Sequence, residues 1–388
     1  LPADAAPDPG GPGPTWRERL SGLPADEAEA TLATWVRAQV AAVLGHPDPE
    51  AVPPHQPFTE LGFDSLTAVG LRNRLQDATG LALPTTLVFD HPSVTDIAAH
   101  LRPLLTSGTP HTPAAAGDGG MLRTLYERSV REGRFDSYLD LLGELAGHRD
   151  RFEGSEDLAA PVDLVELATG PGELRIICCA GTAPVAGPHE FLRIAGALKD
   201  RLPVSALPQP GYEQGEQLPA SLAAVLGVQA DAVLKSADGP FVLVGHSAGA
   251  LMAYALGTEL ADRGRPPQGI VLIDVYPPGQ QQAVHGWLTE LTETMFGREG
   301  VRVDDTRLTA LGAYHRFTRD WRPRALAVPT LLVRATEALG EWPEGESWQS
   351  TWPFPHESAD VPGHHFSMVQ EHAGAVADRI HTWTGNLA

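Results

Sequence analysis

The spacing of hydrophobic residues changes partway along the chain. Between residues 25 and 105, apolar residues recur at helical spacing in three stretches separated by turns rich in Gly and Pro, which predict helices at 28–44, 65–78 and 94–101. From residue 162 onward, short apolar runs alternate with longer helical stretches, which indicates a parallel sheet covered by helices. The pattern therefore predicts a small all-α helical bundle followed by an α/β domain.

Stretches of biased composition separate these two parts. Residues 1–24 begin with a tract of Pro, Gly, Ala and Asp that buries too little apolar surface to order itself, and we interpret them as an upstream linker. Residues 106–120 have the composition of a flexible linker. We therefore expect one domain over 25–105 and a second over 121–388. The start has neither an initiator Met nor a signal pattern, so we expect a piece of a longer protein.

Two helical stretches stand apart from the alternating pattern. Residues 121–152 are amphipathic and leucine-rich, and they predict a pair of helices that either covers an edge of the sheet or leaves an apolar surface for a partner. Residues 277–328 form a long insertion between two predicted strands, with helices expected at 287–296 and 308–321. Because insertions of this length commonly act as lids, we expect this one to roof a pocket for a long, mostly carbon chain.

The sequence FVLVGHSAGA, at residues 241–250, carries the clearest chemical signal. Its first four residues predict a buried strand, residues 245–249 match G-x-S-x-G, and a helix is expected over 250–262. This strand–turn–helix context is typical of a nucleophile elbow, which makes Ser247 the candidate nucleophile. The alternative is a glycine-rich turn that only closes the sheet. With the elbow, the order of strands and helices is that of an α/β-hydrolase.

A serine nucleophile needs a base and an acid, which follow it in the order Ser, Asp/Glu, His in this fold. Both His364 and His365 lie in a predicted loop before the last helix, where the base is expected. Asp274 ends the strand after the elbow unit, and Glu337 follows the next strand. The residues alone do not decide between His364 and His365 for the base, or between Asp274 and Glu337 for the acid. Tyr276, two residues after Asp274, is a candidate substrate contact.

The tetrahedral intermediate also needs two backbone N–H donors for its oxyanion. One is expected from Ala248, the residue after the nucleophile. The other is expected from the loop that follows the predicted strand at 174–180, which contains Thr182 and Ala183.

Net charge limits the classes of binding partner, and cysteine content indicates the redox state of the compartment in which the protein works. The formal net charge of −21 argues against nucleic acid or an anionic membrane, and no apolar run approaches the length of a membrane span. Cys178 and Cys179 are adjacent in an apolar strand, so their side chains point to opposite faces and we expect no disulfide between them. Neither has metal-ligand spacing, so we expect no metal site and a reducing compartment, the cytoplasm.

Residues 28–104 resemble an acyl carrier protein of modular polyketide synthases, on the segments LGFDSLTAVGLRNRL and TTLVFDHPSVTDIAAHL. The resemblance implies that Ser65, the serine of the DSL triplet, carries covalent 4′-phosphopantetheine added by a phosphopantetheinyl transferase. The start of a helix suits a phosphodiester, because free N–H groups and the helix dipole favour an anion. Taken alone, Ser65 would also suit a helix N-cap. The chain departs from the family at Gly70, where an acidic residue is common.

The whole chain resembles the carrier and terminal thioesterase pair of a modular type I polyketide synthase. The resemblance implies a small helical-bundle carrier domain followed by an α/β-hydrolase domain with an N-terminal helical pair and a helical lid insertion. The family motif G-x-H-F places the base on His365, and the segment LIDVYPPG places the acid on Asp274. Thr182, with Ala183 as the alternative, and Ala248 are the implied oxyanion donors. The resemblance also implies that the helical pair at 121–152 forms the surface of a homodimer.

The function implied by this resemblance is the release of a finished polyketide chain. The acyl chain, built by upstream polyketide synthase domains and tethered to the carrier as a thioester, would pass to Ser247. A hydroxyl of the chain would then close a macrolactone. Hydrolysis to a linear acid is the first alternative, and a catalytically silent carrier joined to a dimerising scaffold is the second.

Overall fold

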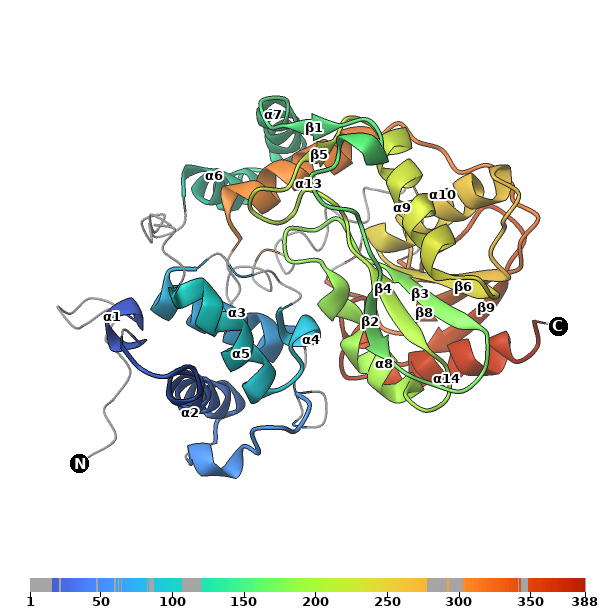
Figure 1. Cartoon of the computed structure of the whole chain (residues 1–388). Helices are drawn as coiled ribbons and strands as arrows, with labels where there is room; N and C mark the ends of the chain where they lie inside the picture. The colour runs from blue at the N-terminus through green and yellow to red at the C-terminus, as the bar shows by residue number, and fades with distance from the viewer. Residues whose placement is uncertain are drawn as a thin grey trace. The chain divides into compact units, whose positions relative to one another are not determined.

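A computed structural model of the chain divides it into two compact units (Figure 1). The first comprises Leu1–Asp118 with Glu299–Arg302, and the second Gly119–Arg298 with Val303–Ala388. The structure describes residues 16–20, 22–46, 48–58, 61, 63, 65–81, 83, 87–106, 120–277, 292, 303–340, 342 and 348–387. The predicted helix at 287–296 therefore lies outside the described residues, apart from residue 292.

The first unit is a helical bundle, as the spacing of apolar residues predicts. Its elements are α1 Trp16–Leu20, α2 Ala25–Leu44, η1 Pro49–Ala51, α3 Ser65–Thr79, α4 Leu87–Asp90 and α5 Val94–Thr106. The side chains that recur at helical spacing on α2 and α5, such as Leu32, Val36 and Ile97, are fully buried. Trp16 of α1 also packs against Trp35, with ring centroids 4.6 Å apart. The packed part of this unit therefore starts before residue 25.

The second unit is built on a seven-stranded sheet in the order β2-β4-β3-β6-β7-β8-β9. The strands are β2 Val165–Ala168, β3 Arg175–Cys179, β4 Val204–Leu207, β6 Phe241–His246, β7 Gly269–Ile273, β8 Thr330–Ala335 and β9 Glu357–Val361. The strands from β4 to β9 pair in parallel, but β2 runs antiparallel to β4 at the edge. β2 is followed directly by β3 without an intervening helix, whereas η3 Pro188–Phe191 and α8 Leu192–Leu198 connect β3 to its parallel neighbour β4.

Helices cover both faces of this sheet. One face packs against α9 Leu222–Ser236, α10 Ala248–Asp262 and α13 Asp305–Thr318, and the other against α8 Leu192–Leu198 and α14 Ala373–Thr384. The two cysteines of β3 lie in the two different cores, with Cys179 on the α10 face and Cys178 on the α14 face. This placement confirms that the two side chains point to opposite faces, and both thiols are free and buried. Burial raises the pKa of Cys179 to about 12.

Several predicted helices are shorter than the sequence pattern indicates. The helical spacing of apolar residues runs over 218–235, but α9 begins at Leu222, because Leu218–Pro219 form strand β5, which pairs with β1 Arg151–Phe152. Ser221 then caps α9, its Oγ accepting a hydrogen bond of 3.1 Å from the Ala224 amide. The last helix, whose apolar spacing runs over 366–387, is split into η4 Ser367–Val369 and α14. Likewise, η3 Pro188–Phe191 precedes α8.

The stretch at 121–152 contains α6 Met121–Arg131 and α7 Phe135–Ala146 (Figure 1). Helix α7 packs closely on α13. A Cβ atom added to Gly312 of α13 would lie 2.4 Å from the Cβ of Leu142, and one added to Gly143 would lie 2.5 Å from the Cδ of Arg316. A side chain at Gly312 would also meet the backbone of Leu142 and Gly143, so glycine at this position lets the helices approach this closely, whereas at Gly143 the Arg316 side chain would have to move. Among the described residues, no helix has both the length and the apolar composition needed to cross a membrane.

Candidate active site

The elbow sequence folds as a tight turn between β6 and α10. Every residue of β6 is buried, and Ser247 follows it with backbone angles φ 54° and ψ −124°. A non-glycine residue in this conformation costs about 1–3 kcal/mol, which the surrounding structure must supply. The Ser247 amide donates a hydrogen bond of 3.0 Å to the carbonyl of Ile273, the last residue of β7. Ser247 is thus held at the end of a central strand, beside the end of β7.

The two glycines of the motif are required by close backbone approach. A Cβ atom on Gly245 would lie 2.2 Å from the Gly249 carbonyl oxygen. A Cβ atom on Gly249 would lie 2.6 Å from the Cys179 carbonyl oxygen and 3.1 Å from the Gly181 amide. Helix α10 therefore begins directly against the end of β3, where the predicted oxyanion loop starts.

Asp274 and His365 come together at the same edge of the sheet. Asp274 follows β7 with φ 44°, and its Oδ2 lies 2.8 Å from Nδ1 of His365, which is in the loop after β9. Both side chains are 2% exposed. Burial alone would raise the pKa of Asp274, but the hydrogen bond with His365, the neighbouring Ser350 hydroxyl and the Ala335 amide together hold that pKa below its usual range.

The alternative acid and the alternative base lie differently. Glu337 is exposed in the loop after β8, where its amide donates 3.0 Å to the Gly363 carbonyl. The ring of His364 turns back onto its own loop, where its Nδ1 accepts from the Phe366 amide at 3.3 Å. Of these carboxylates and imidazoles, the structure brings Asp274 and His365 into contact.

Tyr276 lies against this pair. Its hydroxyl donates to the Trp348 carbonyl at 3.0 Å, and the same oxygen is 3.4 Å from Asp274 Oδ2. Its ring centroid is 5.8 Å from that of His365. The Tyr276 hydroxyl is therefore engaged within the protein, while one side of the ring borders the candidate base.

The loop after β3 is held beside the start of α10. Thr182 is half-buried, and its carbonyl accepts a hydrogen bond of 2.5 Å from the buried Tyr212 hydroxyl. Tyr212 therefore holds the backbone of this loop at the carbonyl of Thr182. Tyr314 belongs to the helix expected at 308–321 in the lid insertion, but it lies in the core, with its ring centroid 5.5 Å from that of Tyr212 and its hydroxyl donating to the Pro210 carbonyl.

His246, inside the motif itself, was not predicted as a functional residue. It is 5% exposed, its Nε2 lies 2.9 Å from the His365 carbonyl oxygen, and the two rings are 4.5 Å apart. Burial and the nearby His365 lower the pKa of His246 to about 3. A carbonyl oxygen only accepts, so neutral His246 carries its proton on Nε2 and steadies the backbone of the candidate base. Its partner lies far along the chain, so no sequence motif signals this contact.

The depressed pKa of His246 predicts a loss of stability in acid. Above the ordinary pKa of 6.5 the ring is neutral in both the folded and unfolded states, whereas below it only the unfolded state gains the proton. Stability should therefore fall by about 2 kcal/mol between pH 7 and pH 5 through this residue. The variant His246→Gln keeps an amide that can donate to the His365 carbonyl but has no group that titrates in this range. In urea unfolding, we therefore expect its free energy of unfolding to fall less than that of the wild type between pH 7 and pH 5, by the amount that His246 contributes. An equal pH dependence in both proteins would contradict this assignment.

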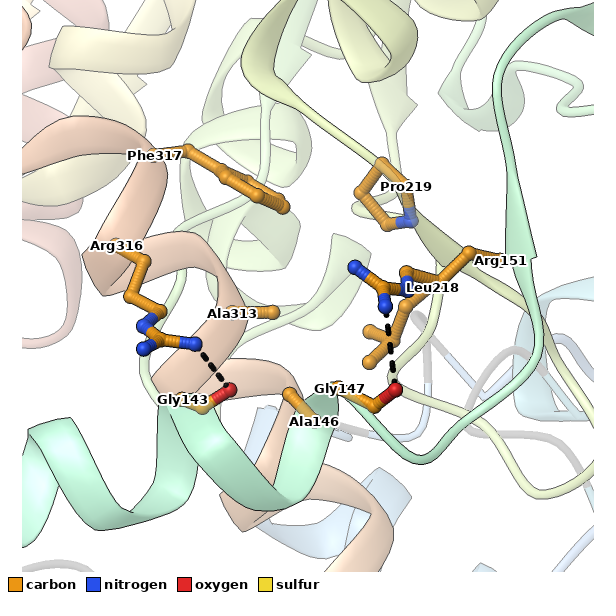
Figure 2. A pocket seen from close by; sticks show the side chains of 9 residues that line it. All are labelled: Gly143, Ala146, Gly147, Arg151, Leu218, Pro219, Ala313, Arg316 and Phe317. Carbon is orange, nitrogen blue, oxygen red and sulfur yellow. Dashed lines mark hydrogen bonds between the residues drawn. The ribbon is translucent and has the colours of Figure 1, made fainter.

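A small pocket of the second unit lies away from these residues. It is lined by residues of α7, α13 and β5, among them Gly143, Ala313 and Leu218 (Figure 2). Neither Ser247 nor Asp274 nor His365 lines it. The candidate site is therefore defined by the strand ends and not by this pocket.

A strand–serine–helix elbow in a mostly parallel sheet, with a histidine and a carboxylate at the same edge, is the arrangement of the α/β-hydrolase class. A thioesterase domain family model matches residues 175–384, and a phosphopantetheine attachment site model matches residues 34–101. The chain belongs to the thioesterase domain family. With the carrier domain before it, this confirms the predicted resemblance to a carrier and thioesterase pair of a modular polyketide synthase. The chain is thus an enzyme of the thioesterase type with covalent 4′-phosphopantetheine as its prosthetic group.

Relatives of the chain are large synthases. It is 60% identical over 355 residues to erythronolide synthase EryA3 of Saccharopolyspora erythraea, covering 91% of this chain and 11% of that protein. It is 39% identical to polyketide synthase GfsE of Streptomyces halstedii, covering 95% of this chain and 10% of that protein. The Vlm2 thioesterase domain is 21% identical with a TM-score of 0.45, covering 57% of this chain and 97% of that domain. The chain thus spans about a tenth of the length of these two synthases.

Proposed function

We propose that this chain releases a finished polyketide by transferring it from the carrier to Ser247 and then closing a macrolactone. The observation that carries the proposal is the 2.8 Å contact between His365 Nδ1 and Asp274 Oδ2 beside the elbow of Ser247. The carrier domain supports it, because a tethered thioester needs an acceptor. When attached, the phosphopantetheine thiol would present the acyl group as an activated thioester.

In the first half of the reaction, His365 takes the proton of the Ser247 hydroxyl as the oxygen attacks the thioester carbonyl. Asp274 accepts the hydrogen bond from Nδ1–H of His365 and stabilises the imidazolium that forms. The amides of Ala248 and Thr182, with Ala183 as the alternative to Thr182, hold the oxyanion. His365 then returns the proton to the departing thiol, and the acyl group remains as an ester on Ser247.

In the second half, a nucleophile attacks that ester with His365 again acting as the base. A hydroxyl of the bound chain gives a lactone, whereas water gives a linear acid. A folded chain holds its own hydroxyl at high effective concentration, which favours the lactone where water is kept out. The name erythronolide synthase, borne by the 60% identical relative, denotes a lactone product and supports this choice. We infer that Tyr276, beside the base, contacts the bound chain.

The product distinguishes the two outcomes directly. The carrier is loaded with a full-length hydroxyacyl pantetheine, and the released product is weighed by mass spectrometry. We expect the lactone, which is lighter than the acid by one water. Release of only the acid would replace macrolactonisation by hydrolysis, and no release from a loaded carrier would favour the non-catalytic scaffold.

Ser65 is the proposed attachment residue. It is the first residue of α3, a helix of 15 residues, and the free N–H groups of a helix start suit the phosphodiester of the prosthetic group. Incubation of the apo-protein with a phosphopantetheinyl transferase and coenzyme A should add the mass of one phosphopantetheine. Ser65→Ala should prevent this addition, while Ser93→Ala, which removes another serine of the same unit, should not. Mass gain by the Ser65 variant would contradict the assignment.

We also infer that α6 and α7 form a homodimer surface. Met121 is 79% exposed and Leu141 is 42% exposed, although Leu142 of the same helix is buried toward α13. Leu141→Glu, and more strongly the double variant with Met121→Glu, should shift the protein from dimer to monomer in sedimentation experiments, because each places a charge in an apolar contact. A wild-type monomer at the same concentration would exclude the dimer.

The remaining partners and boundaries follow from the same proposal. We infer a carrier domain over residues 25–105, with Trp16 of α1 packed against it, a linker over 106–120 and a thioesterase domain over 121–388. Within the insertion at 277–328, the lid is the part that precedes α13, because α13 packs in the core. Upstream polyketide synthase domains would deliver the acyl chain to this cytoplasmic enzyme.

A further inference from the structure

We propose that Glu190 and Arg307 are positioning residues that clamp the oxyanion loop, residues 181–187, from two sides. The inference rests on the proposed function, because it assigns these residues a role in the oxyanion hole of the same site. Neither residue belongs to the elbow, the acid or the base. Glu190 lies in η3, directly after the loop, and Arg307 lies more than a hundred residues later in α13.

Glu190 ties the two ends of the loop together. Its Oε2 accepts hydrogen bonds from the Gly181 amide at 2.9 Å and from the Gly187 amide at 3.3 Å. Thr182 and Ala183, the candidate oxyanion donors, follow Gly181 directly. Burial raises the pKa of Glu190 to about 7, while the two amides and Arg307 act in the opposite direction. An acidic group is thus kept in a costly environment at the place where it closes this loop.

Arg307 holds the carbonyl groups in the middle of the same loop. Its Nη1 donates to the Pro184 carbonyl at 2.8 Å and to the Ala186 carbonyl at 3.1 Å. The side chain is 6% exposed, and its Nη2 pairs with Glu213 at 2.6 Å. A buried guanidinium that satisfies two loop carbonyls is rigid, because any movement leaves a charged donor without a partner.

Helix α13 is itself anchored, so Arg307 has a fixed base. Arg316 of α13 donates to the Gly143 carbonyl of α7 at 2.8 Å (Figure 2). Arg149 donates to the Thr306 carbonyl at 2.9 Å, at the other end of the helix. The close approach of α7 and α13 at Gly312 therefore fixes the residue that holds the oxyanion loop.

We expect these contacts on both sides of the loop to fix the direction of its amide N–H groups before the reaction begins. Oxyanion donors are effective when their direction is fixed in advance, since no reorganisation is then needed as charge develops. The carboxylate of Glu190 holds the two ends of the loop, and Arg307 holds the carbonyls of Pro184 and Ala186 in its middle. Loss of either contact should relax the loop amides without removing the nucleophile, the base or the acid.

The test compares two substrates that differ in one atom. A p-nitrophenyl ester develops its negative charge on oxygen, whereas the matching thionoester develops it on a larger sulfur that amides placed for oxygen stabilise less well. The kcat/KM values for both are measured at pH 8, above the pKa of Glu190, and expressed as a ratio. This ratio is independent of the folded fraction of a variant, because unfolded protein turns over neither substrate.

We expect Glu190→Met and Arg307→Met to lower this oxygen-to-sulfur ratio about tenfold or more, mainly through kcat, as expected for a weakened oxyanion hole. Glu190→Gln, which keeps an acceptor oxygen, should retain most of the ratio. Arg149→Met is the matched comparison, because it loosens one end of α13 but removes no contact to the loop, so the ratio should fall by less than in the Glu190 and Arg307 variants. An unchanged ratio in both Met variants, or an equal fall in Arg149→Met, would overturn the clamp. A wild-type protein inactive on both esters would instead overturn the proposed function, and the clamp with it.

Discussion

Ser247→Ala is expected to lower release of an acyl group from pantetheine thioesters by about 10⁶-fold, the loss typical of removing a serine nucleophile. The reason is that the elbow presents a single hydroxyl at the end of β6, and without it no acyl ester forms. Thiol release from an acyl-pantetheine substrate measures the rate. A fluorophosphonate should add its mass to the wild-type protein and not to the variant.

Ser236→Ala is a suitable control for this experiment, since Ser236 ends α9 and is half-buried away from the strand ends of the site. It should be labelled and should turn over substrate like the wild type. Labelling of Ser247→Ala at an undiminished rate would place the nucleophile elsewhere. Failure to label even the wild type would favour the scaffold without catalysis.

Asp274→Asn is expected to reduce kcat by about 10⁴-fold, as for other acids of this role. Asparagine keeps the shape of the side chain but can present an N–H toward Nδ1 of His365, which favours the wrong tautomer, and it carries no charge to stabilise the imidazolium. The comparison is made by steady-state thioester turnover, with far-ultraviolet circular dichroism to verify that the variant is folded.

Glu337→Gln is the matched control, because Glu337 is the other carboxylate considered for the acid and lies exposed after β8. We expect its kcat to change less than about twofold, as for a surface substitution. The opposite result, with a severe loss in the Glu337 variant and a mild one in Asp274→Asn, would move the acid to the later strand.

Much of the fold follows from local sequence patterns. The period of the apolar residues locates the helices of the first unit and most strands of the second, because a buried helix face and a buried strand each require their own spacing. The local pattern does not predict the structure of segments whose conformation depends on pairing with residues distant in sequence. Leu218 and Pro219 continue the helical spacing, yet they pair with Arg151 and Phe152 as β5 and β1. In the same way, β2 takes its direction from β4 at the sheet edge.

The candidate site also has a part that local sequence predicts and a part that depends on tertiary contacts. The sequence by itself located the elbow of Ser247, since a strand, a close turn and a helix within about twenty residues need only local geometry. Which carboxylate meets which imidazole was decided by the tertiary structure, because the order of strands brings the ends of β7 and β9 to one edge. The contacts of His246, Glu190 and Arg307 also appeared only there. Buried polar groups must find partners, and the chain supplies those partners from segments that no spacing rule connects.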